Sequence, residues 1–449
     1  MLSSYNSYEQ QREILSNTFE AIGQKRELLL TTGQILMESG ADTNRIIRDV
    51  TRVAMFMGIP QEKLHLHITY TTIMLNISDE SHSYTSFRKC LVHVVNLWKI
   101  SAVSRLTWRA LREHYTLEEY RENLERIRNQ SRGYSTTLTI IATGIACGAF
   151  CKLFGCDWYA FIYTSIATML GTFFQRRLIA YGVNHFAAMT FGAFSSTLVA
   201  YFSMIQTFFP ISETPYHPMI ACALYIVPGV PLINAVNDLI NVMLVSGITR
   251  AVHTLLITGG MTFGIVFAIG IFHVDTFTKL ATVSSDGFIL SGIFAAVAAM
   301  GFSVIFNLPR RLMLAAGVGG AISICIRNFL MSIGMSQIAA SFFAATFISL
   351  IALKAIHWFH TPTHVLTVPS VIPMIPGVLL YRVLFSIIHI HNLTIVEFLS
   401  TLQSGVDAIM IILGISIGAS IPNILGNKFI DQQKQKKIDM LLSEEYETR

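Results

Sequence analysis

Residues 227–240 read "VPGVPLINAVNDLI" and lie inside a long apolar region. Pro228 and Pro231 each remove a backbone donor and disturb a helix. Four polar residues follow at the helical spacing i, i+3, i+4 and i+7, and so share one helix face: Asn234, Asn237, Asp238 and Asn241. Lipid would solvate that face poorly. Either it faces protein or water inside a membrane domain, or the stretch lies outside a membrane.

The composition favours the membrane. The chain has 449 residues, of which 52% are hydrophobic and 13% charged. That charge content is about half of a typical soluble domain's. Residues 1–134 and 428–449 are rich in charge, whereas the stretch between them holds only seven acids: Asp157, Glu213, Asp238, Asp275, Asp286, Glu397 and Asp407. We predict a polytopic α-helical membrane protein with a soluble front and a short charged tail.

Ten apolar stretches are long enough to span a bilayer. They start near Thr137, Trp158, His185, Pro218, Thr254, Phe288, Leu312, Gln337, Val365 and Val406. Two of them contain a Pro-Gly pair, at Pro228-Gly229 and Pro376-Gly377, and an offset of 148 residues relates these pairs and the other spans. The sequence therefore predicts two five-span repeats, 135–275 and 276–427. Because five is odd, the repeats should have inverted topology, as in many secondary transporters.

Basic residues indicate the orientation. The inner loops of one orientation hold two arginine doublets together with Arg250 and Lys354: Arg176-Arg177 and Arg310-Arg311. The outer loops and span ends hold Lys152, Lys279, Arg327 and Arg382. This bias places both termini in the cytosol.

The soluble front, residues 1–134, has the pattern of a small cytosolic α/β domain. A first helix should end near Glu38, Gly40 suits a left-handed helix C-terminus, and Asp42 or Thr43 can cap a second helix over residues 44–58. Residues 62–77 alternate like a strand, and a second strand is expected over Tyr84–Val95. Helices are expected over 97–111 and 116–130, the latter with a capping box from Thr116 to Glu119.

Enzymatic and metal chemistry find little support. His65 and His67 share a strand face, but no third ligand stands at a diagnostic spacing, so we predict neither metal nor cofactor. Glu38, Asp42 and Asp49 could suggest acid/base chemistry, although helix capping and a solvated face explain them more simply. The six cysteines show no CxxC spacing, and the five in the apolar region are expected to be small buried hydrophobes. No basic stripe with interleaved aromatics points to nucleic acid.

Three segments together resemble the threonine/serine exporter family. They are "ILMESGADTNRIIRDVTRVAMFMGI" (35–59), "VPGVPLINAVNDLINVMLVSGITRA" (227–251) and "PSVIPMIPGVLLYR" (369–382). The first carries the amino-terminal motif Glu38, Ser39, Gly40, Asp42, Thr43 and Arg45. The resemblance implies export of small hydrophilic metabolites across the inner membrane, driven by the proton-motive force. Some members carry the two modules on separate chains, and one such pair resembles a succinate exporter; here the modules are fused near residue 275.

We therefore predict a secondary transporter, not an enzyme, whose partners are a small-molecule substrate, protons and the lipid bilayer. The substrate stays open between threonine/serine-type amino acids and a dicarboxylate such as succinate, and so does self-association into a homo-oligomer. No "GxxxxGK[ST]" motif supports an ATP-driven pump. The competing interpretations are a membrane-anchored hydrolase with its site at "ESGADT", and a channel.

Three hypotheses concern the transport site. Asp238 is the principal proton-linked or substrate-linked carboxylate, with Asp407 as the second choice and a structural hydrogen bond as the alternative. The two Pro-Gly breaks meet near the pseudo-symmetry axis and line a polar cavity. Arg382, which the 148-residue offset pairs with Asn234, binds a substrate carboxylate at the outer side of that cavity unless it reaches the outer headgroups.

Overall fold

The structure is a computed structural model that describes residues 22–78, 82–130, 133–204, 212–272, 287–359, 361–388 and 394–447. The predicted junction between the repeats at residues 275 and 276 lies outside these ranges. The chain divides into two compact units. The first comprises Met1–Ser131, Asn241–Ser246 and Gln432–Arg449, and the second comprises Arg132–Ile240 and Gly247–Asp431.

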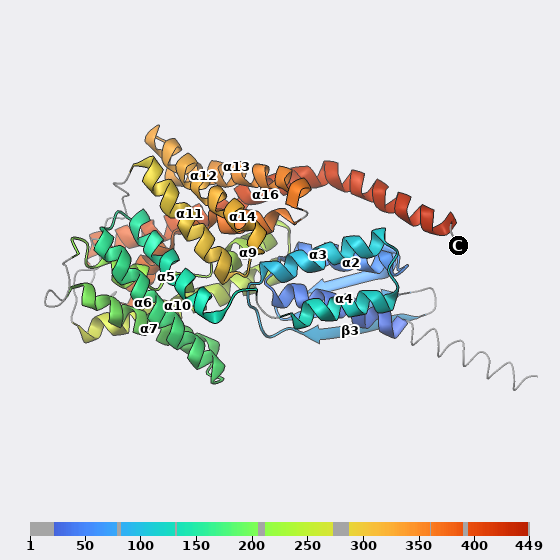
Figure 1. Cartoon of the computed structure of the whole chain (residues 1–449), viewed down its shortest axis with the longest axis horizontal. Helices are drawn as coiled ribbons and strands as arrows, with labels where there is room; N and C mark the ends of the chain where they lie inside the picture. Colours follow the sequence, from blue (N-terminus) through green and yellow to red (C-terminus); the bar gives the residue numbers. More distant parts are fainter. Residues whose placement is uncertain are drawn as a thin grey trace, which may run out of the picture. The chain divides into compact units, whose positions relative to one another are not determined.

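The first unit contains a three-stranded antiparallel sheet in the order β1-β2-β3 (Figure 1). The strands are β1 (Leu64–Ile68), β2 (Thr72–Ser78) and β3 (Ser83–Lys89). The stretch 62–77, expected to be one strand, is a hairpin, because the chain turns at Thr69, whose hydroxyl accepts a hydrogen bond from the Thr72 N–H at 3.1 Å. The second expected strand ends at Lys89 rather than Val95. His65 and His67 lie on the exposed face of β1.

Helices cover the other face of this sheet. They are a first helix over residues 22–38, α2 (Thr43–Phe56), α3 (Leu97–Arg112) and α4 (Leu117–Asn129). Gly33 allows the first helix to approach both its neighbours, because a Cβ there would lie 2.9 Å from Ile73 Cδ1 and 3.4 Å from Val50 Cγ2. The expected capping box of α4, Thr116 with Glu119, is confirmed. A short 3-10 turn, η1 (Gln61–Lys63), precedes β1.

The turn between two helices of the second unit is grouped with the first unit. Asn241–Ser246 links α9 (Gly229–Ile240) to α10 (Leu244–Ile271), and the Ser246 hydroxyl donates a hydrogen bond to the Ile68 carbonyl of β1 at 2.9 Å. Val242 has a φ of 64°, a left-handed conformation that a β-branched residue rarely adopts. Because this turn ends α9 at Ile240, Asn241 does not continue the polar helix face, contrary to the sequence prediction.

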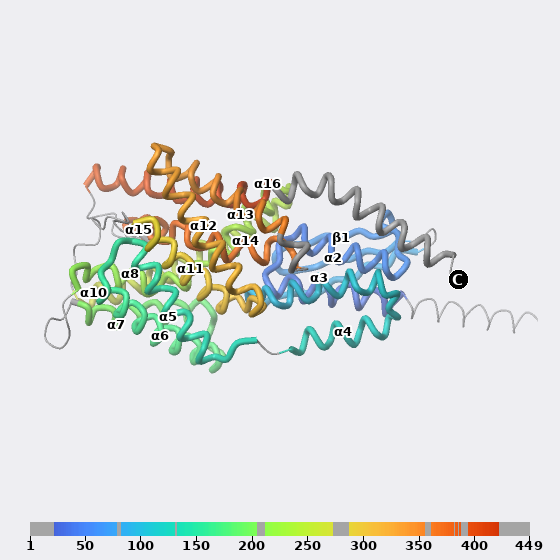
Figure 2. Tube along the Cα trace, turned by 45° about the horizontal axis from the view of Figure 1, so that its top comes forward, coloured from blue at the N-terminus to red at the C-terminus, as the bar shows by residue number. Residues whose placement is uncertain are grey.

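The second unit is a bundle of helices (Figure 2), and its two halves have the same order of α-helices, although one 3-10 turn differs in position. Each half has three helices, a short helix with a 3-10 turn, a break, a helix of 12 residues and a long helix. Before α9 and α10, the first half contains α5 (Thr136–Leu153), α6 (Trp158–Ala180), α7 (His185–Ala200), η2 (Tyr201–Met204), α8 (His217–Ala221) and η3 (Leu224–Ile226). The second contains α11 (Phe288–Ile305), η4 (Arg310–Leu312), α12 (Met313–Ser332), α13 (Gln337–Phe359), α14 (Thr363–Val371), η5 (Ile372–Met374), α15 (Gly377–Ile388) and α16 (Ile395–Glu447).

Fewer described helices have the length and hydropathy of a membrane span than the ten that the sequence predicts. Among the described residues, seven helices are long and apolar enough to cross a membrane, and two bent helix pairs raise the number to nine. The predicted span that begins near Trp158 corresponds to α6, which is a helix of 23 residues but is absent from that set. Its threonines, Gln175 and the Arg176-Arg177 doublet lower its hydropathy. The chain is therefore a multi-pass helical membrane protein, while ten spans and the inverted topology stay predictions.

Small residues allow the helices of the bundle to approach closely. The first helices of the two halves, α5 and α11, pack against each other at Gly301, where a Cβ would lie 2.6 Å from Ala146 Cβ and 2.8 Å from the Ala142 carbonyl oxygen. Gly144 plays the same part between α5 and α6, because its Cβ would stand 2.6 Å from the Ser165 carbonyl oxygen. The contact between the halves thus depends on a missing side chain.

We expect Gly301→Val to separate α5 from α11 and to lower the thermal stability of the purified protein. Overpacking of a closely packed contact costs about 1–3 kcal/mol. Gly259→Val in α10 is the matched control, because no atom lies within 4 Å of its added Cβ. Thermal unfolding in detergent measures both variants, and equal melting temperatures for the two would contradict the packing argument.

Candidate functional site

The polar face of α9 is buried inside the second unit. Asn234, Asn237 and Asp238 expose 1%, 8% and 1% of their surfaces. Polar side chains are costly to bury unless each finds a partner. Each of the three contacts a side chain from a different helix, so the face predicted from the sequence is a contact surface within the protein.

Asp238 forms an ion pair with Arg250. The Arg250 Nε lies 3.2 Å from an Asp238 carboxylate oxygen, and the two side chains expose 7% and 1% of their surfaces. Arg250 was expected in an inner loop, but it lies within α10 and is buried. The reason is that α10 begins at Leu244, ten residues before the apolar run that marked its predicted start. At this distance the cation compensates the charge of the buried carboxylate.

The two amides of α9 contact the second half of the chain. The Asn234 amide oxygen lies 3.3 Å from Nε2 of His364 in α14, and the Ser420 hydroxyl of α16 donates to the Asn237 amide oxygen at 2.9 Å. His364 and Ser420 carried no signal in the sequence. Arg250 carried one, because it stands twelve residues after Asp238 in an apolar stretch where a cation needs an anion.

Both helix breaks occur at the predicted Pro-Gly pairs. The segments His217–Ile226 and Gly229–Ile240 meet at 57°, and Thr363–Met374 and Gly377–Leu384 meet at 62°. A Cβ added to Gly229 would stand 2.5 Å from Ile375 Cδ1, and one added to Gly377 would stand 2.9 Å from Leu224 Cδ2. Each glycine therefore faces the opposite break, and the expected meeting of the two breaks is what the structure contains.

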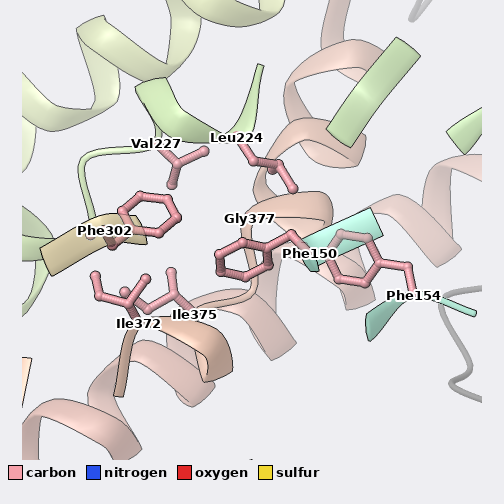
Figure 3. Close-up of a pocket in the computed structure, with 9 residues that line it drawn as sticks. Phe150, Phe154, Leu224, Val227, Phe302, Ile372, Ile375 and Gly377 are labelled. Carbon is pink, nitrogen blue, oxygen red and sulfur yellow. The ribbon is translucent and has the colours of Figure 1, made fainter. Parts of the chain in front are cut away.

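The cavity between the breaks is apolar, contrary to the sequence prediction (Figure 3). Its volume is about 20 Å³, close to the space of one water molecule. The Phe150 and Phe302 rings and the side chains of Leu224, Val227, Ile372 and Ile375 surround it. The backbone offers few free polar groups there, because the proline nitrogens carry no hydrogen and 3-10 bonds pair Val227 N–H with Leu224 and Ile375 N–H with Ile372.

The other predicted site residues belong to helices other than α9. Arg382 is half-buried in α15, and Asp407 is half-buried in α16. The arginine that pairs with Asp238 is Arg250.

The amino-terminal motif forms a corner between helices in the first unit. Gly40 has a φ of 78°, and the N–H groups of Gly40 and Ala41 donate to the carbonyls of Met37 and Leu36, which ends the first helix. Asp42 caps α2 by accepting the Arg45 N–H at 2.9 Å and also pairs with the Arg45 side chain at 3.4 Å. The remaining motif residues support the same corner: Glu38 accepts from Gln34, the Ser39 carbonyl accepts from Asn96 N–H, and Thr43 is buried.

Two family models cover most of the chain. The model described as "Putative threonine/serine exporter" matches residues 27–272. The model described as "Threonine/Serine exporter, ThrE" matches residues 291–425. The first model covers both the amino-terminal motif of the first unit and the α9–α10 ion pair. The second model covers the other break, so both modules stand in one chain.

Curated relatives resemble this chain at low identity. "Probable succinate transporter subunit YjjP" of Escherichia coli (strain K12) is 25% identical over 244 residues, which is 54% of this chain and 93% of that protein. A protein of the same description from Klebsiella aerogenes is 26% identical over 234 residues, 52% of this chain and 88% of its own. An "Uncharacterized protein" of Haemophilus influenzae is 29% identical over 175 residues, 36% of this chain and 58% of its own. No solved structure matches.

We expect Asp238→Asn to destabilise the protein, because it leaves the buried Arg250 without its anionic partner. Breaking a buried ion pair costs roughly 3–5 kcal/mol, whereas removing both charges is far less harmful. The double variant Asp238→Asn with Arg250→Gln should therefore recover much of the lost stability. Thermal unfolding in detergent tests this, with Asp407→Asn as the control at a half-buried acid. A single variant as stable as the wild type would refute the role of the pair.

Proposed function

The chain belongs to the threonine/serine exporter family, and we propose on that premise that it is a secondary exporter of a small zwitterionic amino acid, coupled to protons at Asp238. The observation that carries the proposal is the buried ion pair of Asp238 with Arg250 at 3.2 Å. An amino acid carries the same two charges in reverse, an ammonium group for Asp238 and a carboxylate for Arg250. The substrate can therefore replace the pair without leaving either charge unmatched.

The same arrangement provides a way to couple export to protons. A protonated Asp238 no longer attracts an ammonium group, so proton and substrate compete for it. In an exporter, a proton entering from the outside would displace the substrate there, and its loss to the cytosol would restore the substrate site. Competition of this kind exchanges one entering proton for one leaving substrate. The proton-motive force can drive export by this exchange.

The apolar closure between the breaks serves as a gate in this proposal. Ile372 and Ile375 of one break face Gly229, and Leu224 and Val227 of the other face Gly377. Asp238 lies nine residues after Gly229 in α9, roughly 14 Å along the helix axis. A substrate at Asp238 would thus lie on one side of this closure, and a rearrangement of the broken segments would expose it to the other side.

A succinate exporter is the second candidate, and the description of the Escherichia coli and Klebsiella relatives favours it. A dicarboxylate offers two anionic groups, so it would suit Arg250 and the half-buried Arg382 better than the Asp238 carboxylate. The two candidates therefore differ in what they require of Asp238: the zwitterion needs its negative charge, whereas the dicarboxylate is repelled by it.

Efflux from proteoliposomes distinguishes the candidates. Vesicles loaded with labelled threonine, serine or succinate are diluted under an imposed proton gradient, and we expect efflux of the amino acids. The stable double variant Asp238→Asn with Arg250→Gln should lose at least about tenfold in rate, because a charge-assisted contact contributes about 1.5–3 kcal/mol.

The exposed Glu213→Gln is the control, and its efflux should match the wild type. Efflux of succinate alone would select the second candidate. Wild-type amino-acid efflux by the double variant, with unchanged pH dependence, would remove Asp238 from the mechanism.

Arg382 receives a separate test. We expect Arg382→Lys to lower efflux strongly at unchanged protein abundance, because lysine keeps the charge but not the planar fork that binds a carboxylate with two hydrogen bonds. The conservative control is Arg311→Lys at an exposed position of η4. Normal efflux by Arg382→Lys would instead support an arginine that reaches the lipid headgroups, a role that lysine fills nearly as well.

A further inference from the structure

The corner between α5 and α6 brings two cysteines together. α5 ends at Leu153, Gly155 takes a left-handed φ of 83°, and the N–H groups of Gly155 and Cys156 donate to the carbonyls of Lys152 and Cys151. These two hydrogen bonds close the end of the helix. The longer of them brings the side chains of the residues that it joins into contact. Those residues here are Cys151 and Cys156, and their sulfur atoms lie 2.8 Å apart.

We infer that Cys151 and Cys156 are a redox pair that closes to an intramolecular disulfide. The two sulfur atoms are already within about 0.8 Å of the bonded distance of about 2.0 Å. The helix-closing backbone, rather than a chance contact of side chains, holds them there. Both residues are buried, with exposures of 0% and 1%, so the bond would form while the corner folds and would afterwards be shielded from solvent.

The reaction needs an oxidant. A disulfide of a thiol oxidoreductase is attacked by one of the two thiolates to give a mixed disulfide, and the second cysteine then displaces the oxidoreductase sulfur. The pair loses two protons and two electrons, and the oxidoreductase leaves as a dithiol. Lys152 lies in the same turn and donates a hydrogen bond to the Cys156 carbonyl, which adds a further contact that holds the corner closed.

The orientation that the basic residues predict, on which the proposed function also depends, supports this chemistry. With the amino terminus in the cytosol, α5 crosses outward and its carboxyl end reaches the outer face, where disulfides form and persist. The same corner touches the gate. Phe150 and Phe154 flank Cys151 and line the cavity between the breaks (Figure 3). Asp157, next to Cys156, accepts hydrogen bonds from Ser212 at 2.8 Å and Thr214 at 3.0 Å, in the segment that precedes α8.

The test measures the thiol state of the full-length protein, and its outcome does not depend on any transport assay. Cells are quenched in acid, and free thiols are alkylated under denaturing conditions. The protein is then digested, and the masses of its peptides are measured by mass spectrometry. We expect the segment with Cys151 and Cys156 to be unalkylated and lighter by two hydrogen atoms than the dithiol, and to gain two alkyl groups only after denaturation with reductant.

Cys147 is the internal control. It lies one turn earlier in α5, is equally buried, and should be fully alkylated in the same sample. Alkylation of Cys151 and Cys156 to the same extent as Cys147 would overturn the inference and leave the two residues as small buried hydrophobes. A Cys151→Ser variant should convert Cys156 to a free thiol, and a mixed disulfide at Cys156 in its place would still support the exchange pathway.

Discussion

A charged side chain inside an apolar helix bundle needs an opposite charge within a few ångströms, because neither lipid nor apolar side chains solvate it. Asp238 and Arg250 satisfy that constraint at 3.2 Å, and the course of the chain from α9 to α10 follows from it. The turn after Ile240 must reverse the chain within a few residues so that Arg250, in the second turn of α10, returns beside Asp238. Val242 adopts its left-handed φ of 64° within that turn.

The helix breaks obey the corresponding constraint for the backbone. A break inside a bundle is tolerated only where protein or a cavity covers it and the freed backbone groups find partners. Here the 3-10 bonds before each proline and the short bonds from Gly229 to Val227 and from Gly377 to Ile375 pair most of those groups locally. The breaks can then face each other through apolar side chains. That is why their meeting produces a small apolar cavity and not the polar one that the prolines suggested.

Local chemistry was predictable from the sequence, and long-range pairing was not. The capping of α2 by Asp42, the left-handed Gly40 and the starts of α9 and α15 at Gly229 and Gly377 each depend on a few adjacent residues. The partners His364 and Ser420 come from the other half of the chain, so no local sequence pattern predicts them. Asn241 and Arg250 were misplaced for one shared reason: helical periodicity and apolar runs do not reveal where a turn interrupts two helices.

The comparison between the two halves separates the scaffold from the site. The 148-residue offset relates α9 to α15 residue by residue, and at the positions of Asp238 and Arg250 it places Ser386 and Phe398, which carry no charge. The second break nevertheless holds its angle of 62°, close to the 57° of the first. A buried ion pair is therefore not required to hold such a break. Since buried ion pairs contribute little net stability compared with apolar packing, the architecture that both halves share does not explain the pair in the first half, and this supports the proposal that a substrate exchanges with it.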